Sequence, residues 1–390
     1  MNPRLTRQEL LRRGAAGSAL LAFPSLLAAC GGGGGAGGGG EVKDVLNFAN
    51  WPLYIDTKNS PLLKKYYAET GKGTTLQQFT QETGIKVNYY QEINDNAQYF
   101  AKVQGPLSQG QGIDRDIFVF TDNSRFPGLL VDQGWVQKLD KDLIPNISNL
   151  IDAQASPSFD PNRDYSLPWF SGMTGIAWNS KETQPVRTMD QFFTDPKLKG
   201  KVTMLFELAD SVGLTMLGNG DDPSTVTSET FDRAIKTIED AVDSGQIQKF
   251  YGNDYAEALT KGELAAAIAW SGDIYQLLPD NPQLRWGIPE SGGMIWTDNM
   301  LIPTGGSVPT ASTYMNFVYD PTIAAQLALG AVYISAVKGA KEEAAKMNPT
   351  AASNPLLFPT EETLSQLHQY DAAALNNADQ ITTWQRVTGQ

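Results

Sequence analysis

Cysteine and histidine are almost absent from this chain. Its 390 residues include one cysteine, Cys30, and one histidine, His368. A single cysteine cannot form a disulfide within the chain, and zinc sites are usually built from several cysteine and histidine ligands. A serine-histidine-aspartate triad would have to be built around His368. The composition therefore argues against a metal site and against hydrolysis by such a triad. We expect no cofactor.

Positive charge is scarce as well. Thirty lysines and arginines stand against 43 aspartates and glutamates, a formal net charge of −13. An acidic protein is a poor partner for nucleic acid or for an anionic membrane surface. It suits cationic ligands, although solubility alone is a common reason for an acidic chain. The hydrophobic content of 41% is enough for a full core in the 390-residue chain.

Residues 1–29 have the order of a signal peptide. Four arginines between positions 4 and 13 precede an apolar run over 15–27, which is followed by Leu-Ala-Ala-Cys. The run is too short to cross a bilayer as a helix, which needs about 20 residues. The last four residues resemble the bacterial lipobox, which implies acylation at Cys30. We therefore expect an extracytoplasmic protein held at the membrane only by this lipid. Residues 6–12 resemble a twin-arginine signal except at Gln8, so the export route stays open.

Residues 31–40 consist of nine glycines and one alanine. Glycine runs behave as flexible coil, and ten such residues reach roughly 15–20 Å. With Cys30 acylated, we interpret residues 30–43 as a tether. A phosphate-binding loop is the alternative, but no Gly-Lys-Ser/Thr follows the run.

The rest of the chain alternates between strand and helix patterns, which is typical of an α/β protein. The strands are predicted at 45–50, 85–90, 116–120, 174–178, 202–206, 265–270, 287–289 and 293–303. The helices are predicted at 75–83, 98–104, 189–193, 229–244, 255–261, 312–317, 321–331 and 361–374. Ser228 is placed to cap the helix at 229–244. His368 is expected on the solvated face of the last helix, and the segment 55–72 has no clear assignment.

Three tryptophans stand at or just after the ends of predicted strands: Trp51, Trp270 and Trp296. Asp273 and Asp298 lie within three residues of the last two. Ligands of α/β sheets bind at the carboxyl ends of strands. Aromatic faces attract cations, and carboxylates pair with ammonium groups. A single tryptophan is more often a core residue, but this repeated arrangement predicts a site for a small organic cation.

Other functions remain open from these residues. Tryptophan also stacks on sugars, so a neutral solute is one alternative. Paired acids, either Glu207 with Asp210 or Asp273 with Asp298, would serve an enzyme as general acid and base, as in a glycosidase. A receptor role toward a partner protein is a third possibility.

Five segments carry a resemblance to a known family: NFANWPLYI, QQFTQETGIKV, YSLPWFSGMTGIAWN, AIAWSGD and GGMIWTDNMLIP. The sequence resembles the polyamine-binding proteins of bacterial ABC transporters, which belong to the type II periplasmic binding proteins. The resemblance covers residues 45 to about 335. It implies two α/β lobes, each a mostly parallel sheet flanked by helices, joined by two crossing segments with a cleft between. Lobe 1 would be 44–172 plus 297–340, and lobe 2 would be 173–296 plus 341–390.

The resemblance also implies which residues contact the ligand. Aromatic residues would form the walls, two acids would bind amino groups, and one hydroxyl would replace the serine of the family: Trp51, Tyr54, Trp270, Trp296 and Tyr333; Asp273 and Asp298; Thr121. Possible additional contacts are Glu207, Asp210, Ser211 and Gln369.

This chain departs from the family at several site positions. Leu208 and Ser211 stand where some members have two acids, Leu53 replaces an acid, and Asn123 stands where an aromatic residue is usual. Gln369 aligns only loosely.

Taken as a whole, the resemblance implies a monomeric carrier, not an enzyme, which passes putrescine, spermidine or a related amine to an ABC permease. The same fold binding a sugar or another amine is the alternative.

Overall fold

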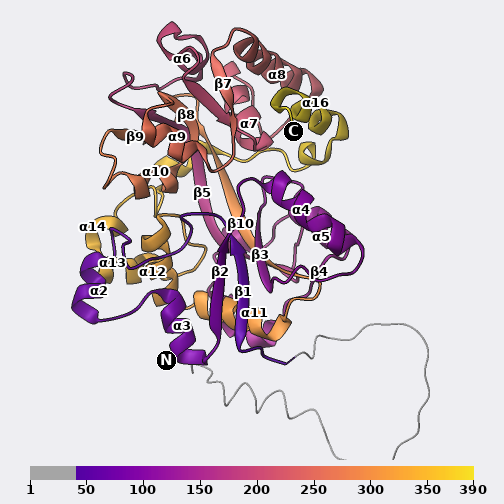
Figure 1. Cartoon of the computed structure of the whole chain (residues 1–390), viewed down its shortest axis with the longest axis vertical. Helices are drawn as coiled ribbons and strands as arrows, with labels where there is room; N and C mark the ends of the chain where they lie inside the picture. The colour runs from indigo at the N-terminus through magenta and orange to yellow at the C-terminus, as the bar shows by residue number, and fades with distance from the viewer. Residues whose placement is uncertain (1–40) are drawn as a thin grey trace, which may run out of the picture.

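The computed structural model describes residues 41–390 (Figure 1). The predicted signal peptide, Cys30 and most of the predicted tether lie outside the described residues. Within residues 41–390, no helix is both long enough and apolar enough to cross a membrane. The expected lipid anchor thus stays a prediction.

The described chain folds into one large mixed sheet with helices packed around it, and this confirms the predicted α/β class. The strands follow one another in space as β2-β1-β3-β10-β5-β8-β6-β7. Their bounds are β1 Val45–Asn50, β2 Lys86–Gln91, β3 Ile117–Thr121, β4 Val136–Gln137, β5 Ser166–Asn179, β6 Val202–Leu205, β7 Ile247–Tyr251, β8 Ala266–Trp270, β9 Leu284–Gly287, β10 Gly293–Pro303 and β11 Leu367–His368.

Two long strands connect the two halves of this sheet (Figure 1). β5 has 14 residues and β10 has 11, and they pair antiparallel at its centre. On one side β1 pairs parallel with β2 and β3, and on the other β6 pairs parallel with β7 and β8. Each half is therefore a parallel group, and the crossing pair joins them. The exact boundaries of two lobes stay a prediction.

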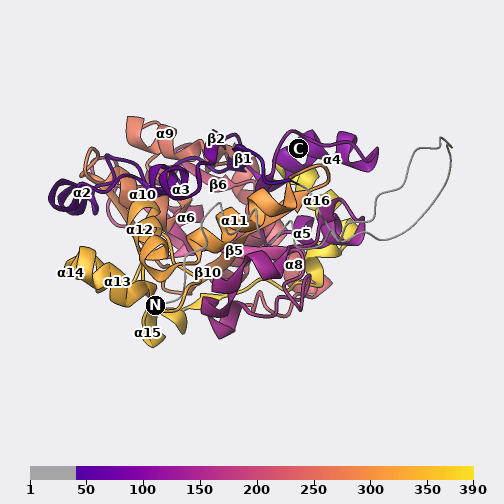
Figure 2. The same ribbon diagram turned by 90° about the horizontal axis from the view of Figure 1, so that it is seen from below.

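Helices cover both halves. Their bounds are α2 Lys64–Thr70, α3 Thr75–Thr83, α4 Asn96–Ser108, α5 Phe126–Asp132, α6 Met189–Thr194, α7 Leu208–Asn219, α8 Ser228–Asp243, α9 Tyr255–Lys261, α10 Ser271–Leu277, α11 Val308–Val318, α12 Pro321–Ala331, α13 Ala340–Met347, α14 Pro349–Ala352, α15 Glu361–Leu364 and α16 Ala378–Thr388. The views in Figures 1 and 2 both place α2, α13 and α14 together on one side of the molecule. The expected helix at 75–83 is confirmed by α3, which ends at Gly84 in the left-handed region with φ 78°.

The start of α8 differs from the prediction by one residue. Thr227, not Ser228, is the N-cap, and its side chain accepts a hydrogen bond from the backbone N–H of Thr230. Ser228 is the first helical residue. Both residue types cap helices well. The N-cap is the one whose backbone is still extended, and here that residue is Thr227.

The predicted helix at 361–374 is wrong. One helical turn, α15, is followed by the short strand β11, in which Leu367 and His368 pair parallel with Gly293 and Met294 of β10. His368 is thus a strand residue at a sheet edge. The helical pattern of the segment is overridden here, because β10 offers unpaired backbone groups that must be satisfied.

The segment 55–72 forms the loop after β1 and the helix α2. Its Leu63 is fully buried in a small second core with Ala325 and Leu329 of α12 and Ala344 of α13. The buried Asp56 accepts hydrogen bonds from the Tyr67 hydroxyl at 2.6 Å and from Gln326 Nε2 at 2.9 Å, and also from residue 75. These contacts hold the chain that follows β1 against α3 and α12.

Candidate ligand-binding site

The structure brings the predicted ligand residues together around one cavity of about 330 Å³, a volume that includes its opening. All eight principal residues line it, and so do Glu207 and Asp210. Three further lining residues were not predicted as contacts: Pro52, Asn123 and Asn253. Two predicted additional contacts do not line it. Ser211 Oγ in α7 donates to the carbonyl of Leu205 at the end of β6 at 2.7 Å, and Gln369 is exposed beyond β11.

The sheet explains why these residues meet. Thr121 and Trp270 are the last residues of β3 and β8, and Trp51 follows the end of β1. Trp296 and Asp298 lie within the crossing strand β10, whose register shifts between Thr297 and Asn299. Such a bulge redirects side chains next to a site. Both halves of the sheet and a crossing strand therefore contribute to the cavity.

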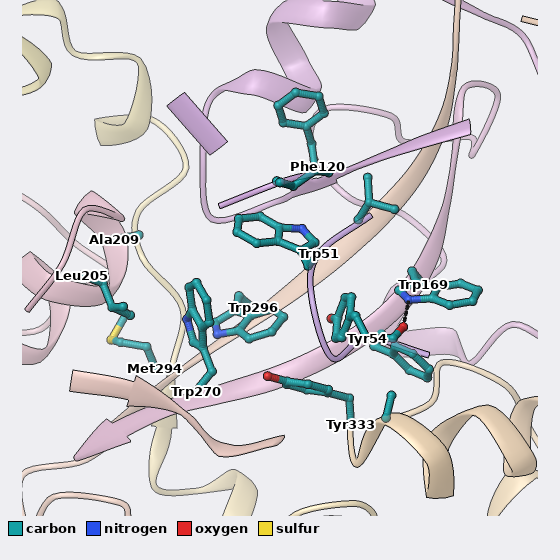
Figure 3. Close-up of a cluster of buried hydrophobic side chains, with 14 of the residues drawn as sticks. Trp51, Tyr54, Phe120, Trp169, Leu205, Ala209, Trp270, Met294, Trp296 and Tyr333 are labelled. Atoms are coloured by element: carbon teal, nitrogen blue, oxygen red, sulfur yellow. Dashed lines mark hydrogen bonds between the residues drawn. The ribbon is translucent and has the colours of Figure 1, made fainter. Parts of the chain in front are cut away.

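Aromatic rings form a continuous wall (Figure 3). Trp270 contacts Trp51 and Trp296 at ring separations of 5.6 and 6.1 Å. Tyr333 continues the wall, at 5.8 Å from Trp296 and 4.7 Å from Tyr54. Three of these contacts are edge-to-face and the fourth is tilted, and the rings that line the cavity offer aromatic surface to a cation or an alkyl chain.

Asp298 accepts the fewest hydrogen bonds of the four acids in the cavity. It accepts one hydrogen bond in the described contacts, from Thr121 Oγ1 at 2.7 Å. Burial raises the pKa of Asp298 to about 7, and the Thr121 hydrogen bond opposes that rise. The buried Tyr54 hydroxyl lies close enough to Asp298 to affect its pKa, but it makes no hydrogen bond of ordinary geometry. Since a carboxylate can accept about four hydrogen bonds, Asp298 has free capacity for an ammonium group.

Asp273 is held by three neutral donors. The Tyr333 hydroxyl donates to Oδ1 at 2.8 Å, while Asn253 Nδ2 and the Tyr255 hydroxyl donate to Oδ2 at 2.8 and 3.1 Å. Burial raises the pKa of Asp273 to about 6, and these hydrogen bonds act in the opposite direction. The acid is therefore oriented without a neutralising cation.

Asp210 organises the tryptophan wall. Its carboxylate accepts from Trp270 Nε1 at 3.0 Å, from Thr174 Oγ1 at 2.9 Å and from Asn123 Nδ2 at 3.2 Å. Thr174 in turn accepts from Trp296 Nε1 at 2.9 Å. Two indole rings are thus fixed, one directly and one through Thr174. Burial raises the pKa of Asp210 to about 6.

Glu207 lies between the halves. Its Oε1 accepts from the backbone N–H of Asn96 at 2.8 Å and from Asn96 Nδ2 at 2.9 Å. Burial, followed by the neighbouring charge of Asp95, raises the pKa of Glu207 to about 8. Glu207 and Asp210, two of the possible additional contacts, thus line the cavity beside positions 208 and 211, where some members of the family have acids.

The cavity is acidic and has no basic counterpart. Within residues 41–390, four acids line it and no lysine, arginine or histidine does. Buried carboxylates without partners are costly, so the arrangement favours a ligand that brings positive charge. No cluster suited to hold a metal ion occurs among the described residues.

Several residues that shape the site escaped the sequence analysis. Asn96, Thr174 and Tyr255 are buried and touch the cavity acids rather than the cavity itself. Asn96 stands in an Asn-Asp-Asn run just after β2, and polar residues that follow a strand are candidates for a ligand site in an α/β sheet. Thr174 and Tyr255 give no local signal.

A mixed sheet whose parallel halves are joined by two antiparallel crossing strands, with a cavity lined by strand ends and by a crossing strand, defines a solute-binding protein of the type II periplasmic-binding-protein fold. Comparison with known families agrees. Residues 74–359 match the family described as bacterial extracellular solute-binding protein, and the chain belongs to this family. Its members serve transporters as solute-binding proteins, and the chain is not an enzyme.

Individual relatives are distant but cover most of the chain. The spermidine/putrescine-binding periplasmic protein of Salmonella typhimurium is 24% identical over 326 residues, which are 83% of this chain and 85% of that protein. The solved structure of a putative spermidine/putrescine ABC transporter from Listeria monocytogenes has a TM-score of 0.71 at 24% identity, over 89% of this chain and 98% of the other.

A structure solved in complex with agropinic acid is almost as similar in fold. The binding protein AgtB of A. tumefaciens, in complex with agropinic acid, has a TM-score of 0.69 at 17% identity over 89% of this chain and 99% of its own. Similarity at this level concerns the fold alone, so the ligand must be argued from the cavity.

Proposed function

We propose that this chain captures a polyamine of the putrescine or spermidine type and delivers it to an ABC permease. The observation that carries the proposal is the set of four buried acids in an aromatic cavity that no basic residue lines among the described residues. Charged amino groups pair with carboxylates, and methylene stems pack on aromatic faces. A flexible cation with separated charges uses both features.

In this proposal Asp298 and Asp273 bind the terminal ammonium groups. Asp298 has the largest free hydrogen-bonding capacity of these two acids, and Asp273 is held in place by three donors. Trp51, Trp270 and Trp296 flank the methylene chain. Tyr54 and Tyr333 complete the aromatic wall of the cavity, and Thr121 orients Asp298.

Transport requires capture and release. Two lobes that close on the ligand would provide both, because the ligand stabilises the closed form by contacts made only there. We propose that the protein acts as a monomer outside the cytoplasm, anchored by an acylated Cys30 with the glycine-rich residues as a tether. The tether would keep the binding domain near its permease.

Another small solute is the alternative, because a protein of similar fold was solved with agropinic acid. A ligand that carries a carboxylate would face the four acids of this cavity, and a neutral sugar would leave them without compensation. The acids therefore favour a polycation over both.

Calorimetry tests the proposal. Purified full-length protein in mild detergent would be titrated with putrescine, spermidine, an amino acid amide and a disaccharide. We expect saturable binding of at least one polyamine and no binding of the disaccharide. The opposite pattern would reject a polyamine carrier and support the alternative.

A further inference from the structure

Asn96 uses its backbone and side chain to connect two acids that lie on different elements of the cavity. Its Nδ2 donates to Glu207 Oε1 and to Thr121 Oγ1, each at 2.9 Å. The same threonine hydroxyl donates to Asp298 Oδ1 at 2.7 Å. The backbone N–H of Asn96 gives Glu207 a second hydrogen bond, at 2.8 Å.

The direction of this chain of hydrogen bonds is determined by the backbone. The N–H of Thr121 donates to Asn96 Oδ1 at 3.1 Å, so the carbonyl end of the amide must face β3. The NH2 end then supplies the two donors. Because Thr121 Oγ1 accepts one of them, its own hydrogen points toward Asp298. Glu207 and Asp298 therefore both accept from a network centred on one buried asparagine, which is 1% exposed.

The two acids differ in what they offer a ligand. Glu207 is joined to the first residue of α4, a helix of 13 residues that follows β2, whereas Glu207 itself follows β6 in the other half of the sheet. The backbone N–H of Asn253, in the turn after β7, donates to the Asn94 carbonyl at 2.9 Å and gives the loop after β2 a second contact with the other half of the sheet. The contact between Asn96 and position 207 requires a hydrogen-bond acceptor at position 207, and it does not require a negative charge there.

We infer that Asn96 is a positioning residue that couples Asp298 to closure, and that Glu207 serves as the hydrogen-bond acceptor between the halves rather than as an ammonium ligand. The inference rests on the proposed function and sharpens it: only Asp298 and Asp273 pair with amino groups. The ligand class that fits is a linear diamine, with one amino group for each of these acids. A triamine would require a third acid that pairs with an amino group.

Substitutions at position 207 separate the two roles. Glu207→Gln keeps an oxygen acceptor for Asn96 but removes the charge, whereas Glu207→Ala removes both. We expect Glu207→Gln to bind putrescine within about threefold of the parent protein. Glu207→Ala and Asn96→Ala should each weaken binding by roughly tenfold, the usual effect of losing one or two buried hydrogen bonds. Glu263→Gln, on the exposed turn after α9, is the matched control.

The double variant Asn96→Ala/Glu207→Ala should lose less affinity than the two single effects combined, because both single variants lose the hydrogen bond from Asn96 Nδ2 to Glu207 Oε1. If Glu207→Gln instead loses as much affinity as Glu207→Ala, then Glu207 is an ammonium ligand and the inference is overturned. Tighter binding of spermidine than of putrescine would overturn the assignment to diamines.

A second readout does not depend on the ligand. In thermal unfolding of the unliganded full chain, Glu207→Gln should be as stable as the parent protein, while Glu207→Ala and Asn96→Ala should unfold at lower temperature. Equal unfolding temperatures for all three variants would contradict the hydrogen-bonding role. If the parent protein binds no polyamine yet this order of stability holds, the proposed function fails while the contact between the halves stands.

Discussion

The hydroxyl of Tyr333 donates a hydrogen bond of 2.8 Å to Oδ1 of Asp273. Tyr333 directly follows Val332, the residue that caps the end of α12 with φ 58°, a left-handed conformation that β-branched residues rarely adopt. This turn directs the tyrosine ring into the aromatic wall. One residue thus completes the wall and orients an acid proposed to bind an amino group.

Replacing Tyr333 by phenylalanine should therefore weaken polyamine binding by roughly tenfold, while the ring wall remains. The lost hydrogen bond favours the ionised form of Asp273, so without it the pKa of Asp273 should rise further. Calorimetry with putrescine checks this. Tyr165→Phe, in which a tyrosine outside the cavity is changed, should bind as the parent does. Unchanged affinity in Tyr333→Phe would remove Asp273 from the proposed ligand contacts.

Asp298→Asn should reduce polyamine affinity by a hundredfold or more, because it removes the charge from the least occupied acid in the cavity. The same change should leave the unliganded protein as stable or make it more stable, since burial disfavours the ionised acid. Calorimetry and thermal unfolding measure the two effects, with Asp232→Asn on the exposed face of α8 as control. A variant that keeps full affinity would contradict the role of Asp298.

Affinity should rise with pH between about 5 and 8. Burial raises the pKa of Asp298 to about 7 and that of Asp273 to about 6, so these acids bind more protons in the folded, unliganded protein than in the unfolded chain. A bound polycation favours the ionised acids, and binding releases their protons. Each released proton makes affinity change by up to roughly tenfold per pH unit.

The stability of the unliganded protein should change in the opposite direction. A raised pKa in the folded state stabilises the protein below the pKa of the unfolded chain, and this contribution is lost as pH rises through the folded value. Thermal unfolding without ligand should therefore show falling stability from pH 5 to 8. Calorimetry of ligand binding in buffers of different ionisation enthalpy counts the protons that the acids release. Affinity independent of pH would mean that the acids are already ionised without ligand.

Gly172→Ala should disrupt the aromatic wall. A Cβ at this position would lie 2.5 Å from Trp296 Cη2 and 2.9 Å from Tyr333 Cε1, so both rings would have to move. We expect at least tenfold weaker binding and a lower unfolding temperature. Gly128→Ala is the control, because its Cβ would meet only Phe159 at an ordinary 3.5 Å. Equal behaviour of the two variants would show that the wall tolerates displacement.

Much of the site could be predicted from local patterns. Trp51, Thr121 and Trp270 follow or end strands, and the sheet collects such positions at one place. Thr174 and Tyr255 could not be predicted, because a threonine within a strand and a tyrosine at the start of a helix look like ordinary structural residues. Their contacts to Asp210 and Asp273 depend on partners 36 and 18 residues away.

The amino-acid sequence by itself determined the α/β class, the two strand ends that carry Trp51 and Trp270, and the acidic character of the chain, because these follow from local periodicity and composition. Trp296 lies within β10 and not at a strand end as predicted. Only the tertiary structure decided that Glu207 and Asp210, rather than Leu208 and Ser211, face the cavity, and that residues 367–368 form a strand. Both outcomes depend on how one segment meets another across the sheet. The packing of α7 places Glu207 and Asp210 at the cavity, and pairing with the edge of β10 outweighs a helical pattern at 367–368.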